Sequence, residues 1–250
     1  MEDPYNLYFT PDGRAAIVVA EKQKRLDFRD PHTMALQQSL PTPECSGVNH
    51  ADFSIDGRFA IFTCEFCGGG LIKVDMVNHK VLGHLNLSRP GMPQDIRIAP
   101  DGRVFYVADM HADGVFLVDG GAFKEIGFIR TGIGAHGLYP SRDGTKLYVA
   151  NRGSHSTQGR PHGKGSIAVI DSRPTRSSTS GRSPAAAVPT WVMSAPMASS
   201  CGCPGGWDNV VYDIDTTTGA ENRAGRIEPH ELTVWPQPGR YSLGHTGNMR

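Results

Sequence analysis

Short hydrophobic runs alternate with polar turns along most of this chain, and one arrangement of them returns four times. In each case an apolar residue leads within a few positions to an Asp-Gly pair and then to a run rich in β-branched and aromatic residues. A period of about 40 to 50 residues is the size of a four-stranded propeller blade, so the pattern predicts an all-β fold, a β-propeller of antiparallel blades. The pairs are Asp12-Gly13, Asp56-Gly57, Asp101-Gly102 and Asp143-Gly144, with aspartates 44, 45 and 42 residues apart.

Each Asp-Gly pair predicts a hairpin turn between two strands. Glycine tolerates positive φ and aspartate can bond its own backbone, so the runs before and after the pair can be antiparallel partners. The fourth copy, Tyr139-Pro-Ser-Arg-Asp143, contains one residue more than the others. Its third run also comes about ten residues late, and we interpret residues 152–165 as a long loop between strands. The runs after the turns are 15–19, 59–63, 104–108 and 146–150, and the third runs are 25–28, 71–74, 115–118 and 166–170.

Two of these runs carry a family signature. Tyr148-Val-Ala-Asn151 and Tyr106-Val-Ala-Asp109 closely resemble the Tyr-Val-Thr-Asn motif of the YVTN-repeat β-propellers, the YncE-like group related to the lactonase and cytochrome d1 propellers. The resemblance covers most of residues 3–173 and 208–250. It implies a seven-bladed ring, in proteins that are often exported, and it implies no particular reaction.

We therefore expect a single propeller domain over residues 1–250. About five and a half units are recognisable, which do not close a ring by themselves, so the expected ring is an incomplete seven-bladed one. Its unpaired strand edges favour self-association. The expected parts are blades at 3–40, 46–87, 92–131 and 135–176, an aberrant segment at 177–206 and remaining blade strands at 207–250.

The segment from Arg173 to Trp207 departs from the repeat, and a flexible linker is the simplest interpretation. We favour another one, which uses the single codons of tryptophan and methionine. When the codons of residues 189–198 are read in a frame that starts at the third base, they permit an Asp-Gly pair at about 196–197. This position fits the repeat spacing once the additional residues of the long loop are subtracted. We hypothesise two compensating frameshifts, near 171–187 and 198–207. The prolines here should then leave the segment irregular, with 208–215 as an orphaned outer strand.

The amino terminus raises a related expectation. Met1-Glu-Asp-Pro4 has neither a basic n-region nor an apolar h-region, so it predicts no signal peptide. The chain instead starts directly on the innermost strand of a blade. We expect that one or two upstream blades, and any export signal, are missing from this reading frame.

Composition excludes some partners. The formal net charge is +0 and the isoelectric point is about 7.1, with both signs well mixed, so no electrostatic feature favours nucleic acid. There is no run of 18 apolar residues, so no membrane span is expected.

Polar residues stand just ahead of the predicted innermost strands, in comparable positions of successive repeats. In a propeller these positions face the mouth of the central channel, where imidazoles and carboxylates could hold a metal or an anionic ligand. Alternatively, each side chain only bonds the backbone of a neighbouring blade. The five candidates are Asn6, His50, Asp95, His136 and His230.

Cys64-Glu-Phe-Cys67 has the spacing of a zinc half-site or a redox pair. A structural zinc site needs four ligands and no second such pair occurs, so we favour reduced structural thiols over a disulfide or a metal site. No Gly-x-Ser-x-Gly elbow, Walker loop or His-Glu-x-x-His motif occurs.

The sequence therefore favours a non-catalytic propeller that binds a protein or a small-molecule ligand over its channel mouth, with no cofactor. One alternative is a lactonase-like hydrolase, in which a channel-bound divalent metal polarises a carbonyl and activates water. The other is a non-functional fragment of a larger propeller.

Overall fold

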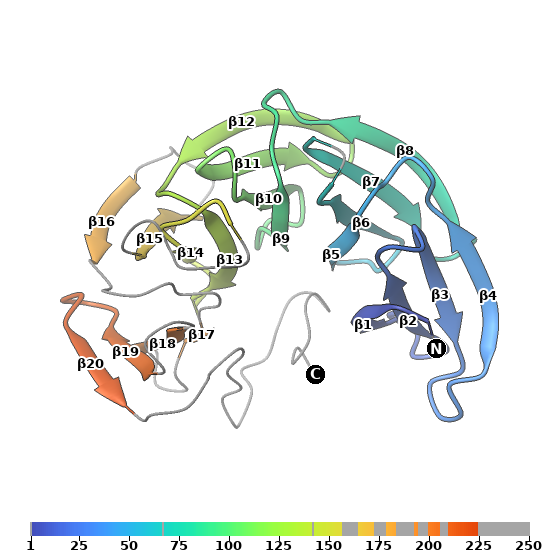
Figure 1. Cartoon of the computed structure of the whole chain (residues 1–250), viewed down its shortest axis with the longest axis horizontal. Helices are drawn as coiled ribbons and strands as arrows, with labels where there is room; N and C mark the ends of the chain where they lie inside the picture. The colour runs from blue at the N-terminus through green and yellow to red at the C-terminus, as the bar shows by residue number, and fades with distance from the viewer. Residues whose placement is uncertain are drawn as a thin grey trace.

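The computed structural model describes residues 2–66, 68–141, 143–156, 165–172, 179–183, 193–194, 200–205 and 210–224. These residues form five four-stranded antiparallel sheets, each with its strands in chain order. The sheets lie side by side along an arc, with the first strand of each sheet nearest the centre and the last at the rim (Figure 1). The prediction of an all-β propeller is confirmed.

The first three sheets repeat with nearly constant spacing. Sheet 1 comprises β1 (Pro4–Phe9), β2 (Ala16–Ala20), β3 (Arg25–Arg29) and β4 (Leu36–Pro41). Sheet 2 comprises β5 (Val48–Phe53), β6 (Phe59–Cys64), β7 (Gly70–Asp75) and β8 (Lys80–Asn86). Sheet 3 comprises β9 (Pro93–Ile98), β10 (Val104–Asp109), β11 (Gly114–Asp119) and β12 (Lys124–Arg130).

The last two sheets contain the irregular part of the repeat. Sheet 4 comprises β13 (Ala135–Pro140), β14 (Lys146–Asn151), β15 (Ser166–Asp171) and β16 (Thr179–Ser183). Sheet 5 comprises β17 (Met193–Ser194), β18 (Ser200–Gly205), β19 (Val210–Asp215) and β20 (Glu221–Ala224). No helix long and apolar enough to cross a membrane occurs in the part of the chain that the structure describes.

The Asp-Gly pairs lie in the turns between the first and second strands of sheets 1 to 4. In the first turn, Asp12 Oδ1 accepts hydrogen bonds from Thr10 Oγ1 at 2.7 Å and from the backbone N–H of Arg14 at 3.0 Å. Gly13 has φ 69°, a left-handed conformation that glycine adopts without strain. Asp56, Asp101 and Asp143 likewise accept the N–H of the residue two positions on, and Gly57, Gly102 and Gly144 have φ of 70°, 72° and 69°.

The fourth turn has the same length as the others, so the additional residue of the fourth sequence motif lies at the end of the strand and not in the turn. Gly144 N–H donates to Ser141 O at 2.9 Å, as Gly13 N–H does to Thr10 O at 2.8 Å. Ser141 is therefore the first residue of its turn, and Pro140 occupies the strand-end position that Phe9 has in sheet 1. The apolar residue that sequence reasoning aligned there, Tyr139, lies one position earlier on the strand.

The hydrophobic core lies between neighbouring sheets rather than in one central cluster, as expected for stacked blades. Phe28 and Leu26 of sheet 1 pack against Phe53 and Phe62 of sheet 2, and all four are fully buried. Equivalent clusters fill the next two junctions. They contain Ile61, Leu71, Ile96, Phe105 and Phe116 between sheets 2 and 3, and Ala108, Val115, Leu138, Val149 and Ile170 between sheets 3 and 4.

The fifth sheet corrects the expectation for residues 177–206. β18 pairs with β19 from Ser200 to Gly205, so β19 is not an orphaned strand, and β16 pairs with β15. Strand pairing uses backbone groups that every residue except proline supplies, and the one proline of β18, Pro204, lies next to its end. The proposed Asp-Gly position at 196–197 falls between β17 and β18, outside the described residues. The frameshift hypothesis stays a prediction about the gene.

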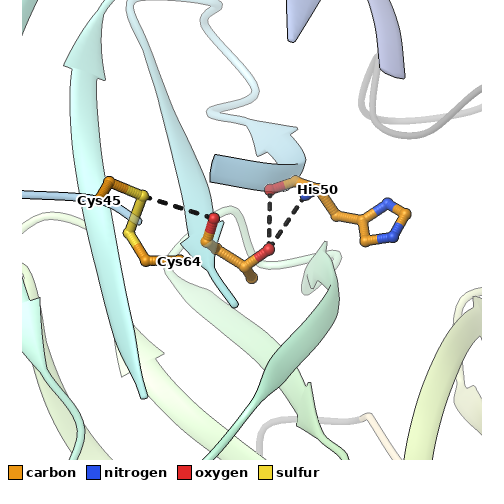
Figure 2. Close-up of a disulfide and its surroundings, with 4 residues drawn as sticks. Cys45, His50 and Cys64 are labelled. Carbon is orange, nitrogen blue, oxygen red and sulfur yellow. Dashed lines mark hydrogen bonds between the residues drawn. A yellow bond between two sulfur atoms is a disulfide. The ribbon is translucent and has the colours of Figure 1, made fainter. Parts of the chain in front are cut away.

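The cysteines also differ from the expectation. Cys64, at the end of β6, forms a disulfide with Cys45, which lies in the connection between sheets 1 and 2 (Figure 2). The preference for a reduced thiol at Cys64 is therefore wrong, because the chain between the sheets crosses the end of β6 and brings the two Cα atoms to 4.9 Å. Cys67 lies outside the described residues.

We predict that this disulfide stabilises the fold. Cys45→Ala combined with Cys64→Ala should lower the free energy of unfolding by about 3 kcal/mol, because a bond that closes a loop of this length restricts the unfolded chain. Urea denaturation of the wild type and the double variant measures the difference. Reductant should lower the midpoint of the wild type and leave the double variant unchanged, whereas equal midpoints for oxidised and reduced wild type would contradict the prediction.

Candidate functional site at the channel mouth

The innermost strands β1, β5, β9 and β13 each contain a β-bulge near their first residues. The pairing register shifts between Pro4 and Asn6 in β1, and it shifts near the first residues of the other three strands as well. A bulge adds a residue and turns its side chains to a new direction. The predicted site residues of the first four sheets lie at or next to these bulges.

The structure places the candidates in two different positions of the repeat. Asn6, His50 and Asp95 each precede the aspartate of their turn by six residues, whereas His136 precedes Asp143 by seven. Gly137 takes the equivalent position in sheet 4, because the fourth turn has no additional residue. His230 lies outside the described residues.

Asn6 and His50 are brought together across the first junction. Asn6 Nδ2 donates a hydrogen bond to His50 Nδ1 at 3.0 Å, and the ring of Tyr5 meets the His50 ring edge-on at 5.8 Å between centroids. The backbone N–H of His50 donates to Thr63 Oγ1 at 3.0 Å, on the strand that also carries the disulfide (Figure 2). His50 is thus held by sheet 1 and by its own sheet.

Asp95 has a different set of partners. It is fully buried, and its Oδ2 accepts the backbone N–H of Leu138 in the next sheet at 2.9 Å. Its Oδ1 accepts Arg97 Nη1 at 2.6 Å and the N–H of Ile96 at 2.9 Å. Burial raises the pKa of Asp95 to about 6, against the opposing effect of Arg97. The bond to Leu138 matches the alternative interpretation, in which the side chain only bonds the backbone of a neighbouring blade.

Sequence reasoning missed a second set of residues at the same end of the strands. Glu21, Glu65 and Arg152 each follow the last residue of the second strand of their sheet, nine residues after the aspartate of the turn. All three are buried. The signal was available, since a constant offset from each Asp-Gly pair defines an equivalent place in every blade. In sheet 3 the same position is occupied by Met110.

Glu21 and Glu65 form a carboxyl pair. Burial, together with the charge of the neighbouring Glu65 carboxyl group, raises the pKa of Glu21 to about 7. Glu21 therefore gains or loses its proton near neutral pH. Asn49 Nδ2 donates to Glu65 Oε2, which fixes one side of the pair.

Arg152 adds a cation from the fourth sheet. Burial lowers the pKa of Arg152, while Tyr5 and Glu65 act in the opposite direction through their charges. Tyr5 comes from β1 and Glu65 follows β6, so groups from sheets 1, 2 and 4 interact at one end of the channel. A guanidinium, two carboxyl groups and a phenol ring can together recognise a small polar molecule.

The disulfide contributes to the position of Glu65. The N–H of Glu65 donates to Gly47 O at 2.8 Å, and the N–H of Phe66 donates to Ser46 O at 2.9 Å. Both acceptors directly follow Cys45, whose bond to Cys64 joins the same two chain segments. The connection between sheets 1 and 2 therefore supports the carboxyl pair.

Among the residues that the structure describes, no group of three or more His, Cys, Asp or Glu side chains is arranged to hold a metal ion. The lactonase-like alternative stays a prediction.

A comparison with protein-family models finds no match, and a comparison with curated proteins finds none. Among solved structures 1460 chains match, which indicates a widely shared fold. One of them is the hydrazine synthase of Kuenenia stuttgartiensis, with a TM-score of 0.68 and 18% sequence identity. The match covers 90% of this chain and 66% of that chain. At this identity the likeness shows the propeller fold alone.

We predict a pH-dependent contribution of Glu21 to stability. The unfolded chain releases this proton near pH 4.5 and the folded chain retains it to about pH 7, so the contribution of Glu21 falls as pH rises through this interval. Glu21→Gln has no proton to release. The melting temperature of the wild type minus that of Glu21→Gln should therefore decrease from pH 4.5 to 7 and then level off, and parallel profiles would disprove the raised pKa.

Proposed function

We propose that this protein is a non-catalytic binding β-propeller of the YVTN-repeat kind, which holds a small-molecule ligand at the channel mouth beside Glu21, Glu65 and Arg152. The observation that carries the proposal is the convergence of buried ionisable side chains from three sheets at one end of the channel. Perturbed ionisable groups gather at functional sites.

The fold itself does not require polar residues at this place. Met110 occupies the equivalent position in sheet 3 and is fully buried. Burying a charged group costs free energy that an apolar residue of similar volume avoids. A scaffold alone would therefore favour methionine or leucine in all four sheets, whereas ligand recognition accounts for Glu21, Glu65 and Arg152.

An exposed aromatic side chain, Tyr5, accompanies these buried groups. The Tyr5 side chain remains 48% exposed although it interacts with His50 and Arg152. An aromatic ring held in place and open to solvent provides a surface on which a ligand can pack. The site therefore combines an apolar face with a small number of convergent polar groups, which is typical of small-molecule sites.

The YVTN-like motifs support the kinship with that family. Asn151, the last residue of the motif in sheet 4, accepts a hydrogen bond from Thr131 Oγ1 at 2.8 Å. Asp109, its counterpart in sheet 3, accepts the N–H groups of Met92, His111 and Ala112 at 2.8 to 3.0 Å. Asn151 and Asp109 each accept hydrogen bonds from the segments that lead into or out of their sheets. A polar side chain therefore recurs at this position for a structural reason.

The disulfide supports a location outside the reducing cytoplasm. Disulfides form and persist mainly in oxidising compartments, and Cys45–Cys64 is fully buried. We therefore include export from the cytoplasm in the proposal.

A thermal-shift screen tests the proposed site. The probes are alkylamines, short carboxylates, monosaccharides and phosphate esters, each added at millimolar concentration to the wild type. At least one class should raise the melting temperature, because a ligand that binds only the folded state stabilises it. The increase should be lost in Glu65→Gln or Arg152→Ala.

Arg58→Ala is the matched control, since Arg58 is exposed in the turn at the opposite end of β5. It should retain the full shift. The proposal fails if no class stabilises the wild type, or if every stabilising compound acts equally on the Glu65 and Arg152 variants.

A further inference from the structure

We infer that the channel mouth binds a primary ammonium group, held between the carboxyl groups of Glu21 and Glu65 and the side-chain amide oxygen of Asn49. The inference rests on the proposed function and specifies the chemical class of its ligand. It follows from the hydrogen-bonding capacity of the three residues, from the charges around them and from the ring of Tyr5, which like Glu65 acts on Arg152.

The side-chain amide of Asn49 has an unused hydrogen-bond acceptor. Asn49 is fully buried, its Nδ2 donates to Glu65, and its Oδ1 has no hydrogen-bond partner. A buried amide oxygen without a donor is rare in folded proteins, and each such case calls for an explanation. A ligand that supplies an N–H donor next to Glu65 provides one.

The carboxyl groups of Glu21 and Glu65 are neighbours. Burial and the charge of Glu65 raise the pKa of Glu21 to about 7, so Glu21 keeps its proton up to neutral pH. Together with Asn49 Oδ1 the pair offers three acceptor groups. A primary ammonium has three N–H donors, no acceptor and a positive charge, so it can take the place of the Glu21 proton and satisfy all three acceptor groups.

The charged groups around Glu21 and Glu65 favour a cation. The ionisable groups that act on Glu21 are Glu65, Asp3 and Lys22, and Arg152 approaches Glu65 from sheet 4. With both glutamates ionised, three acids therefore face two cations at the mouth. A bound ammonium balances this excess negative charge, whereas an anionic ligand would increase it.

The exposed ring of Tyr5 completes the recognition. It stands edge-on to His50, which Asn6 holds in place, so the orientation of the ring is fixed from both sheets. A cation next to an aromatic face is attracted by the negative charge of that face, and the alkyl part of an amine can pack on the ring. The ligand therefore combines an ammonium head with a short apolar chain.

Isothermal titration calorimetry at pH 8 with n-butylammonium chloride tests this inference. The wild type should bind the probe, whereas n-butanol, which lacks the charge, and tetramethylammonium, which lacks N–H donors, should bind at least tenfold more weakly. Glu21→Gln, Glu65→Gln and Asn49→Leu should each weaken butylammonium binding by about tenfold or more. Glu44→Gln, the same substitution at an exposed site, should leave the affinity unchanged.

Proton release provides a second measurement that a general loss of structure would not imitate. Since the ammonium displaces the proton of Glu21, the affinity should fall by about tenfold for each pH unit below 7. At pH 6 the observed enthalpy should differ between buffers of different ionisation enthalpy by an amount that corresponds to one released proton. Glu21→Gln should release none.

Three outcomes overturn the inference: equal binding of n-butanol or tetramethylammonium, unchanged affinity in both glutamine variants, or binding without proton release. If a carboxylate or a sugar binds at the mouth and butylammonium does not, the inference is wrong and the proposed function stands. If no probe of any class binds, both are wrong.

Discussion

The architecture depends on how each innermost strand satisfies the backbone groups that face away from its own sheet. Such a strand pairs on one side only, so alternate N–H groups on its other edge have no ladder partner and cannot be left unbonded when buried. Side chains of the preceding sheet accept them. Tyr8 Oη accepts the N–H of Ala51 at 3.0 Å, Asp52 accepts that of Ile98 at 2.7 Å and Asp95 accepts that of Leu138 at 2.9 Å.

These bonds give the sheets their order around the centre and determine what the channel can contain. A carboxylate that bonds to the next sheet, such as Asp95, is committed to the fold, even though its residue type and position suggest a ligand site. The groups that we propose for recognition directly follow the second strands of their sheets. An apolar residue is compatible with the fold at this position, as Met110 shows. The stability of the fold therefore does not require the polar side chains of Glu21, Glu65 and Arg152.

The fold and the site are joined by the connection between sheets 1 and 2. Cys45 is bonded to Cys64, and the two residues that follow Cys45 accept the N–H groups of Glu65 and Phe66. The same covalent link that restricts the chain therefore holds one carboxyl group of the pair in place. The likeness to a solved propeller extends to the fold alone.

The repeat, the hairpin turns and the all-β architecture could be predicted from the sequence, because Asp-Gly pairs and alternating apolar runs act locally and recur at a fixed spacing. It also held the offset that locates Glu21, Glu65 and Arg152. The sequence could not show which polar residues bond to the backbone of the next sheet and which face one another, since those contacts join residues about one blade apart. For the same reason the sequence could not reveal that Cys64 pairs with Cys45 rather than remaining reduced, or that His136 and His50 occupy different places. A strand register shifted by one residue changes where each side chain points, and only the paired strands fix that register.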